Sequence, residues 1–100
     1  MDQTGGNQAS MVRARLVISG RVQGVYFRAS SRDVARAQRL SGWVRNRHDG
    51  GVETAVEGEE GAVRAFIDWC YDGPPGARVT AVQVAIEPYT GELQGFHIVG

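Results

Sequence analysis

The sequence predicts a single α+β domain in which two amphipathic helices cover one face of an antiparallel sheet. Three observations indicate this class. Apolar residues alternate with polar ones in several short segments, as in half-buried strands, and recur every three or four residues in two longer segments, as in helices. These segments follow one another in the order β-α-β-β-α-β. With 100 residues, 42% of them hydrophobic, the chain holds enough apolar material for one core and too little for two.

The first ten residues differ from the rest of the chain. They are polar, contain the glycine pair Gly5 and Gly6, and show no hydrophobic period. Such a segment buries too little surface to offset the entropy lost on ordering. We therefore expect residues 1–10 to form a flexible tail and residues 11–100 to form the domain.

Residues 11–19 alternate between apolar and polar side chains and predict the first strand. The residues on its apolar side are Val12, Ala14, Leu16 and Ile18. After a loop at residues 20–25, a helix is predicted from about residue 26 to residue 40. The residues at three-residue intervals that define its apolar face are Val34, Ala37 and Leu40. Gly42 is suited to be the stop signal of that helix.

A hairpin is predicted next. Residues 43–47 and 52–57 are short β-prone runs, and residues 48–51, with the sequence HDGG, supply the positive φ angles that a tight turn requires. Gly58 is expected to end the second of these strands.

A second helix and two more strands complete the pattern. The helix is predicted at residues 59–71, and its apolar stripe consists of Val63, Phe66, Ile67 and Cys70. The segment DGPPG at residues 72–76 ends it. A fourth strand is predicted from the alternating residues Val82, Val84 and Ile86, and a short final strand from Phe96 and Ile98. The order is that of the split βαβ or ferredoxin-like sandwich, with an extra terminal strand.

Composition narrows the range of partners. Eleven basic and eleven acidic residues cancel, so no overall field attracts nucleic acid or an anionic membrane. Cys70 is the one cysteine, so no intramolecular disulfide can form, and no apolar run reaches the length of a membrane span. We expect a cytosolic monomer that binds a small molecule rather than a nucleic acid or a membrane.

The loop between the first strand and the first helix is a candidate anion site. Gly20 and Gly24 permit backbone angles closed to other residues, and successive N–H groups turned inward would form a positively polarised nest. The residues expected to bind an anion in this way are Arg21, Val22, Gln23, Gly24, Val25, Tyr26 and Phe27. Arg28 could then grip two oxygens of a phosphate. The loop is neither a Walker A nor a GxGxxG sequence. From these residues alone, an ordinary strand-to-helix connection is the favoured interpretation and the anion site is the weaker one.

Two longer motifs carry a resemblance to a known family. GRVQGVYFR at residues 20–28 and GWVRNRHDGGVETAVEG at residues 42–58 resemble the two signatures of the acylphosphatases, and the similarity extends over residues 11–100. The resemblance implies a hydrolase without metal or cofactor that cleaves carboxyl-phosphate anhydrides. It implies that Arg28 holds the substrate phosphate and Asn46 orients the attacking water, with a phosphate oxygen accepting the proton. It further implies that the carboxylate of Gly100 orients Arg28.

Other residues are assigned structural roles. Tyr26 and His48 depart from the usual pattern, and we interpret His48 as an exposed hairpin residue rather than a general base. His97 is expected on a solvated strand face, and two separated histidines make no metal site. The residues expected in the core are Trp43, Phe66 and Cys70, and Glu53 is expected to be a structural strand residue.

Two other functions stay open. The same fold could serve as a non-catalytic anion- or RNA-binding module, although an RNA-recognition motif needs exposed aromatic residues and a basic face. The chain could also resemble the N-terminal domain of a larger carbamoyl-transferring maturation protein; because it ends at Gly100, we expect a stand-alone enzyme. Neither signature identifies the acyl group of the substrate.

Overall fold

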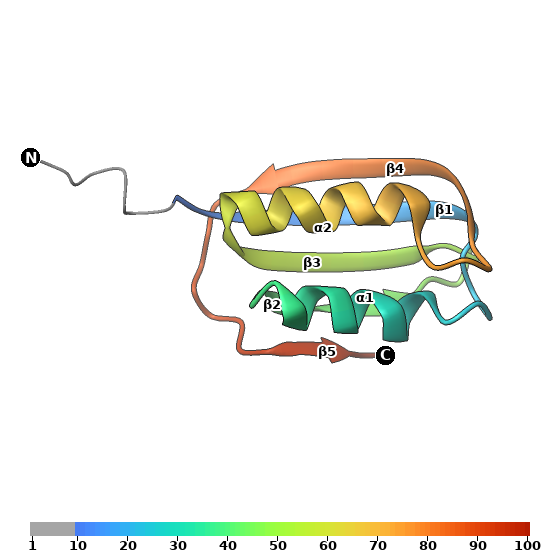
Figure 1. Ribbon diagram of the computed structural model, residues 1–100, viewed down its shortest axis with the longest axis horizontal. Coiled ribbons are helices and arrows are strands. Elements are labelled where there is room, and N and C mark those ends of the chain that lie inside the picture. The colour runs from blue at the N-terminus through green and yellow to red at the C-terminus, as the bar shows by residue number, and fades with distance from the viewer. Residues whose placement is uncertain (1–9) are drawn as a thin grey trace, which may run out of the picture.

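The computed structural model describes residues 10–100, so the predicted tail lies outside the described part of the chain except for Ser10. The elements, in chain order, are β1 (Met11–Arg21), α1 (Phe27–Ala37), β2 (Ser41–Asn46), β3 (Val52–Glu59), α2 (Glu60–Asp72), β4 (Arg78–Glu87) and β5 (Phe96–Ile98). Both helices lie on the same face of the sheet (Figure 1). The predicted fold class is confirmed.

The sheet has the strand order β4-β1-β3-β2-β5. β1 pairs antiparallel with β3 and β4, and β2 pairs antiparallel with β3, which confirms the predicted hairpin. β5 pairs parallel with β2, so the prediction of a wholly antiparallel sheet is wrong for this strand. After β4 the chain crosses the end of the sheet to its far edge, where β5 runs in the direction of β2 (Figure 1). Parallel pairing requires such a crossover.

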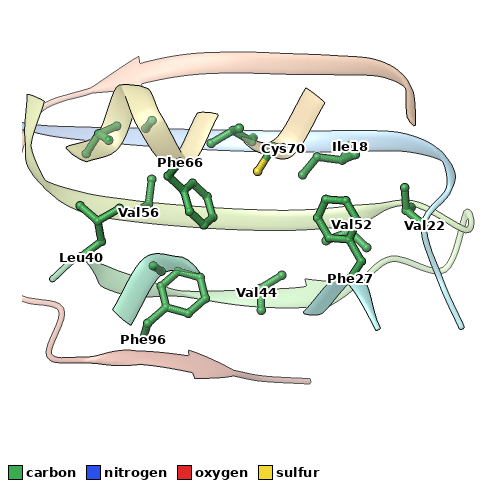
Figure 2. Close-up of a cluster of buried hydrophobic side chains, with 14 residues drawn as sticks. Ile18, Val22, Phe27, Leu40, Val44, Val52, Val56, Phe66, Cys70 and Phe96 are labelled. Atoms are coloured by element: carbon green, nitrogen blue, oxygen red, sulfur yellow. The ribbon is translucent and has the colours of Figure 1, made fainter. Parts of the chain in front are cut away.

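The core lies between the sheet and the two helices (Figure 2). Of the four β1 residues predicted to share an apolar face, Ala14, Leu16 and Ile18 are 0% exposed and Val12 is partly buried. Phe66 and Cys70 face them from α2 and are likewise 0% exposed, as predicted. Burial raises the pKa of the Cys70 thiol to about 12, so this cysteine is a protonated core residue.

The first helix ends earlier than predicted. α1 stops at Ala37, and the chain turns at Arg39, whose φ is 60°. Gly42, the predicted stop signal, lies within β2, where any Cβ would overlap the carbonyl oxygen of Ala55. Leu40 is buried, but it follows the helix rather than belonging to it.

The predicted apolar face of α1 is also partly wrong, because Ala37 is exposed. The buried residues of the helix are Phe27, Ser31 and Ala35, spaced by four. Steps of three residues advance about 300° around a helix, so a face built on them drifts away from the core. Gly58 likewise does not end β3, because it pairs with Val12 and the strand continues to Glu59.

The predicted apolar side of β4 does face the helices, because Val82, Val84 and Ile86 pair with the buried residues of β1. This edge strand is only partly covered, however. Val84 is 39% exposed and Ile86 is 67% exposed, which the alternation of the sequence could not reveal.

The other face of the sheet carries ion pairs. Glu53 is 6% exposed and pairs with Arg15 at 3.1 Å and with Arg45. This agrees with the structural role predicted for Glu53. Trp43, predicted to be a core residue, is half-buried on this open face, with the guanidinium carbons of Arg15 and Arg45 at 5.6 and 6.0 Å from its ring. The prediction fails because residues in a strand alternate between faces, and Val44 takes the core side.

These ion pairs set the protonation of the buried acids. Burial alone would raise the pKa of Glu53, but the hydrogen bonds and charges of Arg15 and Arg45 outweigh burial and hold the pKa below its ordinary value. Glu57 behaves in the same way, since its carboxylate accepts hydrogen bonds from Thr90 and Arg13.

Neither helix in the described part of the chain has the length and apolar character needed to cross a bilayer.

We predict that the open-face carboxylates make the protein sensitive to acid. A pKa lowered in the folded state means that the unfolded chain takes up protons first as the pH falls. The stabilisation is therefore complete above the ordinary glutamate pKa of about 4.3 and is lost as the pH falls below it. Glu53→Gln should lower the free energy of unfolding at pH 7 by about 1–3 kcal/mol and flatten its acid dependence. Urea titrations between pH 3 and 7 measure both effects, with the exposed Glu92→Gln as control. An acid dependence as steep as that of the wild type would contradict this assignment.

Candidate active site

The register of the sheet places the ends of β1 and β2 side by side. Val52 pairs with Ile18 of β1 on one side and with Asn46 of β2 on the other. The loop that leaves β1 and the turn that leaves β2 therefore emerge at the same end of the sheet (Figure 1). The two segments are joined by Gln23, whose Nε2 donates to the carbonyl oxygens of Arg47 at 2.8 Å and Gly51 at 2.9 Å.

The loop before α1 has an unusual backbone. Gly24 has a φ of 76°, and Tyr26, directly before the helix, has a φ of 65° in the left-handed region. A residue other than glycine in that region costs about 1–3 kcal/mol and often marks a functional site. The tyrosine side chain is 82% exposed, so core packing does not explain its conformation.

The main-chain N–H groups of this segment have no partner in the backbone of residues 10–100. In the described part of the chain, no backbone carbonyl accepts a hydrogen bond from the N–H groups of residues 22–29, and the first such bond runs from the N–H of Ser30 to the carbonyl of Tyr26 at 2.9 Å. The first turn of α1 contains no acidic residue. Free N–H groups at the start of a helix are an anion-binding arrangement.

Arg28 and Asn46 line one cavity of about 410 Å³. The complete lining consists of Val22, Gly24, Tyr26, Phe27, Arg28, Ala29, Asn46 and Ile98. Arg28 is exposed and forms no ion pair with a residue in the range 10–100. The Oδ1 atom of Asn46 is buried and accepts no hydrogen bond there. A buried acceptor without a donor costs stability, so it points to a group kept free for a ligand.

Three of the predicted binding residues do not line this cavity. Arg21 ends β1 opposite Arg78, and Gln23 is bonded to the hairpin turn. Val25 faces the loop after α2, where a Cβ on Gly76 would lie 3.5 Å from its side chain. For these three residues, any contact with an anion would come from the main chain.

Two residues of the lining were not predicted, Ala29 and Ile98. Ala29 follows Arg28 in the first turn of α1, so its place could have been inferred from the predicted start of the helix. Ile98 reaches the cavity because β5 pairs with β2 and sets Ile98 opposite Val44. The alternation of a three-residue strand gives no information on its partner.

The remaining candidates lie elsewhere. His48 is exposed in the turn and borders a shallow hollow with Arg45, Arg47 and Asp49, away from Asn46, as predicted. His97 is exposed, and its Nε2 lies 2.9 Å from the carbonyl oxygen of Gln94.

The predicted contact between Gly100 and Arg28 does not form. The main chain of Gly100 lies beside Arg45, where a Cβ would be 3.6 Å from the Cβ of that side chain. Among residues 10–100, no three His, Cys, Asp or Glu side chains cluster as metal ligands.

Sequence comparisons identify the family that this chain resembles. A family model described as acylphosphatase matches residues 14–98. A curated acylphosphatase from Roseiflexus sp. (strain RS-1) is 57% identical over 89 residues, which are 89% of this chain and 96% of the relative. A curated acylphosphatase from Aeropyrum pernix is 56% identical over 90 residues, covering 89% of each chain.

Solved structures give the same picture. The acylphosphatase from Bacillus subtilis superposes with a TM-score of 0.86 at 37% identity, covering 89% of this chain and 99% of that one. Full-length HypF, in a phosphate- and nucleotide-bound form, superposes with a TM-score of 0.81 at 32% identity. That match covers 95% of this chain but 12% of HypF, so the likeness is to one part of a larger protein.

Proposed function

The chain belongs to the acylphosphatase family and is a hydrolase acting on acyl phosphates, and we propose that the cavity between α1 and β2 is its catalytic site. In this proposal the loop N–H groups and Arg28 bind the substrate phosphate, and Asn46 orients the attacking water. The observation that carries the proposal is that Arg28 and Asn46, from different elements, line one cavity.

Phosphate binding is supported by the positive character of the α1 end of the cavity. The N–H groups of residues 22–29 have no backbone acceptor in the described part of the chain, and no acid lies in the first turn of the helix. The guanidinium of Arg28 is not engaged by a carboxylate of residues 10–100, so both of its N–H edges can meet phosphate oxygens in a two-pronged contact.

The water site follows from the chemistry of Asn46. An uncharged carboxamide can accept one hydrogen bond from a water and donate another without placing negative charge beside a phosphate dianion. The unpartnered Oδ1 of Asn46 would accept a hydrogen bond from that water. The oxygen of the water then faces phosphorus, opposite the carboxylate that leaves.

The reaction places modest demands on the protein. Attack of the water forms one P–O bond while the bond between phosphorus and the carboxylate oxygen breaks, which yields a carboxylate and inorganic phosphate. The water proton passes to a phosphate oxygen, so no protein base is required. Because an acyl phosphate is already activated, positioning and charge stabilisation supply the catalysis, and no metal or cofactor takes part.

We further propose that the enzyme is a cytosolic monomer whose substrate is a small molecule. Cys70 is the one cysteine of the chain, so no intramolecular disulfide can form, which suits a reducing compartment. The open face of the sheet carries paired charges, and the ring of its tryptophan, Trp43, is already contacted by the guanidinium groups of Arg15 and Arg45. This arrangement disfavours the RNA-binding alternative.

The direct test is hydrolysis of acetyl phosphate by the wild-type protein, Arg28→Ala and Asn46→Ala, with and without a chelator. We expect wild-type turnover that is indifferent to the chelator and is largely lost in both variants. Turnover that survives in both variants, or that vanishes with the chelator, would overturn the proposed mechanism.

Asn46→Ala should affect the chemical step more than phosphate binding. Loss of one preorganised group that orients the reacting water should raise the barrier by about 3 kcal/mol, a roughly hundredfold decrease in kcat. The inhibition constant of inorganic phosphate should change little, because Arg28 and the loop are intact. Steady-state kinetics and phosphate inhibition measure both quantities. A weakening of phosphate binding as large as the loss of kcat would mean that Asn46 holds phosphate instead.

Arg28→Lys should also fail, because an ammonium group cannot reproduce a planar two-pronged grip. We expect kcat/KM for acetyl phosphate to fall by about two orders of magnitude, by analogy with loss of an electrostatic transition-state contact. Arg32→Lys is the matched control, since Arg32 lies one turn further along α1 and contacts the exposed Asp33. Equal effects of the two substitutions would argue against a specific role of Arg28.

A further inference from the structure

We infer that Gln23 is a positioning residue that ties the phosphate-binding loop to the β2–β3 turn and thereby fixes where bound phosphate lies relative to the water held by Asn46. This inference rests on the proposed function and assigns the side chain of Gln23 a role in addition to the main-chain phosphate contact expected from the sequence. The hydrogen bonds of its side chain to the turn support this role.

The carboxamide nitrogen of Gln23 is fully used within the protein. It lies 2.8 Å from the carbonyl oxygen of Arg47 and 2.9 Å from that of Gly51. A carboxamide nitrogen has two N–H groups, so one is available for each carbonyl. The side chain is absent from the lining of the cavity. Gln23 therefore has no free N–H group on its side chain to offer a phosphate.

The two acceptors lie at the base of the hairpin, directly beyond the pair formed by Asn46 and Val52. Arg47 follows Asn46 in the chain, and Gly51 precedes Val52. One side chain thus holds both strands of the hairpin at the point where the water-orienting residue is placed.

The turn itself is held by its own bonds, which makes it a firm anchor. The N–H of Arg47 donates to the carbonyl of Gly51 at 2.8 Å, and the N–H of Gly51 donates to Oδ1 of Asp49 at 3.0 Å. The loop lacks comparable bonds, because β1 ends at Arg21 and the backbone N–H groups of residues 22–26 have no backbone acceptor among residues 10–100. Gln23 supplies the polar side-chain tie between the two segments.

The proposed site is therefore divided between two segments. The N–H groups and Arg28 belong to one continuous segment that enters α1, whereas Asn46 belongs to β2. Removing the Gln23 carboxamide leaves the bonds within the turn and within α1 in place and loosens the loop relative to the turn. Misplacement of reacting groups by about 1 Å can cost a hundredfold in rate. The expected signature is a loss of kcat without a matching loss of phosphate affinity.

The first test is Gln23→Ala. We expect kcat for acetyl phosphate to fall by about 10- to 100-fold, while inorganic phosphate still inhibits with a nearly unchanged constant. Retained inhibition also shows that the variant is folded. An unchanged kcat would overturn the inference, and so would an inhibition constant that rises in step with the loss of kcat, because that result describes a direct phosphate ligand.

The second test is Gln23→Glu, which keeps the shape of the side chain. A carboxylate facing two carbonyl oxygens cannot donate, so the variant should be at least as impaired as Gln23→Ala at neutral pH. Below the ordinary glutamate pKa of about 4.3, the carboxylic acid regains one O–H donor. The ratio of variant to wild-type kcat should therefore rise as the pH falls.

The control for this test is Gln38→Glu, a substitution at an exposed glutamine after α1 that should leave the ratio near one at every pH. A ratio for Gln23→Glu that stays flat in acid would overturn the inference. If the wild-type protein hydrolysed no acyl phosphate, the proposed function would fail and this inference with it, a result distinct from active enzyme with an indifferent Gln23.

Discussion

The pairing of Val52 with both Ile18 and Asn46 is the constraint on which the site depends. A shift of one residue in the pairing of β3 with only one of these neighbours would move the end of β1 relative to the end of β2 and turn buried side chains out of the core. Val52 is 0% exposed and its neighbours fill the space under the helices (Figure 2), so burial of this row holds the register. Asn46 is the one polar residue in the row that it forms with Ile18 and Val52. Hydrophobic packing of the other two therefore fixes where Asn46 lies.

Alternation of side chains along β3 also separates the acids of this strand from Arg28. Because successive side chains in a strand point to opposite faces, Glu53 and Glu57 of β3 lie on the open face, where arginines of β1 and β2 neutralise them. Arg28 lies on the helix side, beyond the reach of these acids. No carboxylate of the described residues competes with a substrate phosphate for its guanidinium. The ion pairs thus stabilise the fold while leaving the cation of the site unoccupied.

The sequence predicted the parts of this arrangement that depend on local pattern. Alternation identified the buried side of β1, and the glycines of residues 48–51 identified the hairpin. The two signatures pointed to Arg28 and Asn46, which line one cavity and whose catalytic roles stay a prediction. The sequence did not predict features that depend on contacts between distant segments. The parallel edge strand that brings Ile98 to the cavity follows from a pairing that no local period encodes. Trp43 lies on the open face because its neighbour Val44 takes the core side of β2. Gln23 was expected to bind phosphate through its main-chain N–H, which stays a prediction, whereas the bonds of its side chain to the hairpin turn were not predicted.

Several groups around the cavity are held in states that cost stability. Tyr26 has a left-handed backbone, the N–H groups of residues 22–29 lack backbone partners in the described chain, and Oδ1 of Asn46 has none. A phosphate with an attached water would satisfy the second and third of these together, since the anion accepts from the N–H groups and the water donates to Asn46. In the proposed site, the binding energy of the substrate would thus be directed to groups on two separate segments. Because the loop N–H groups and Asn46 belong to different segments, the protein must fix their relative placement. The carboxamide of Gln23 joins the two segments.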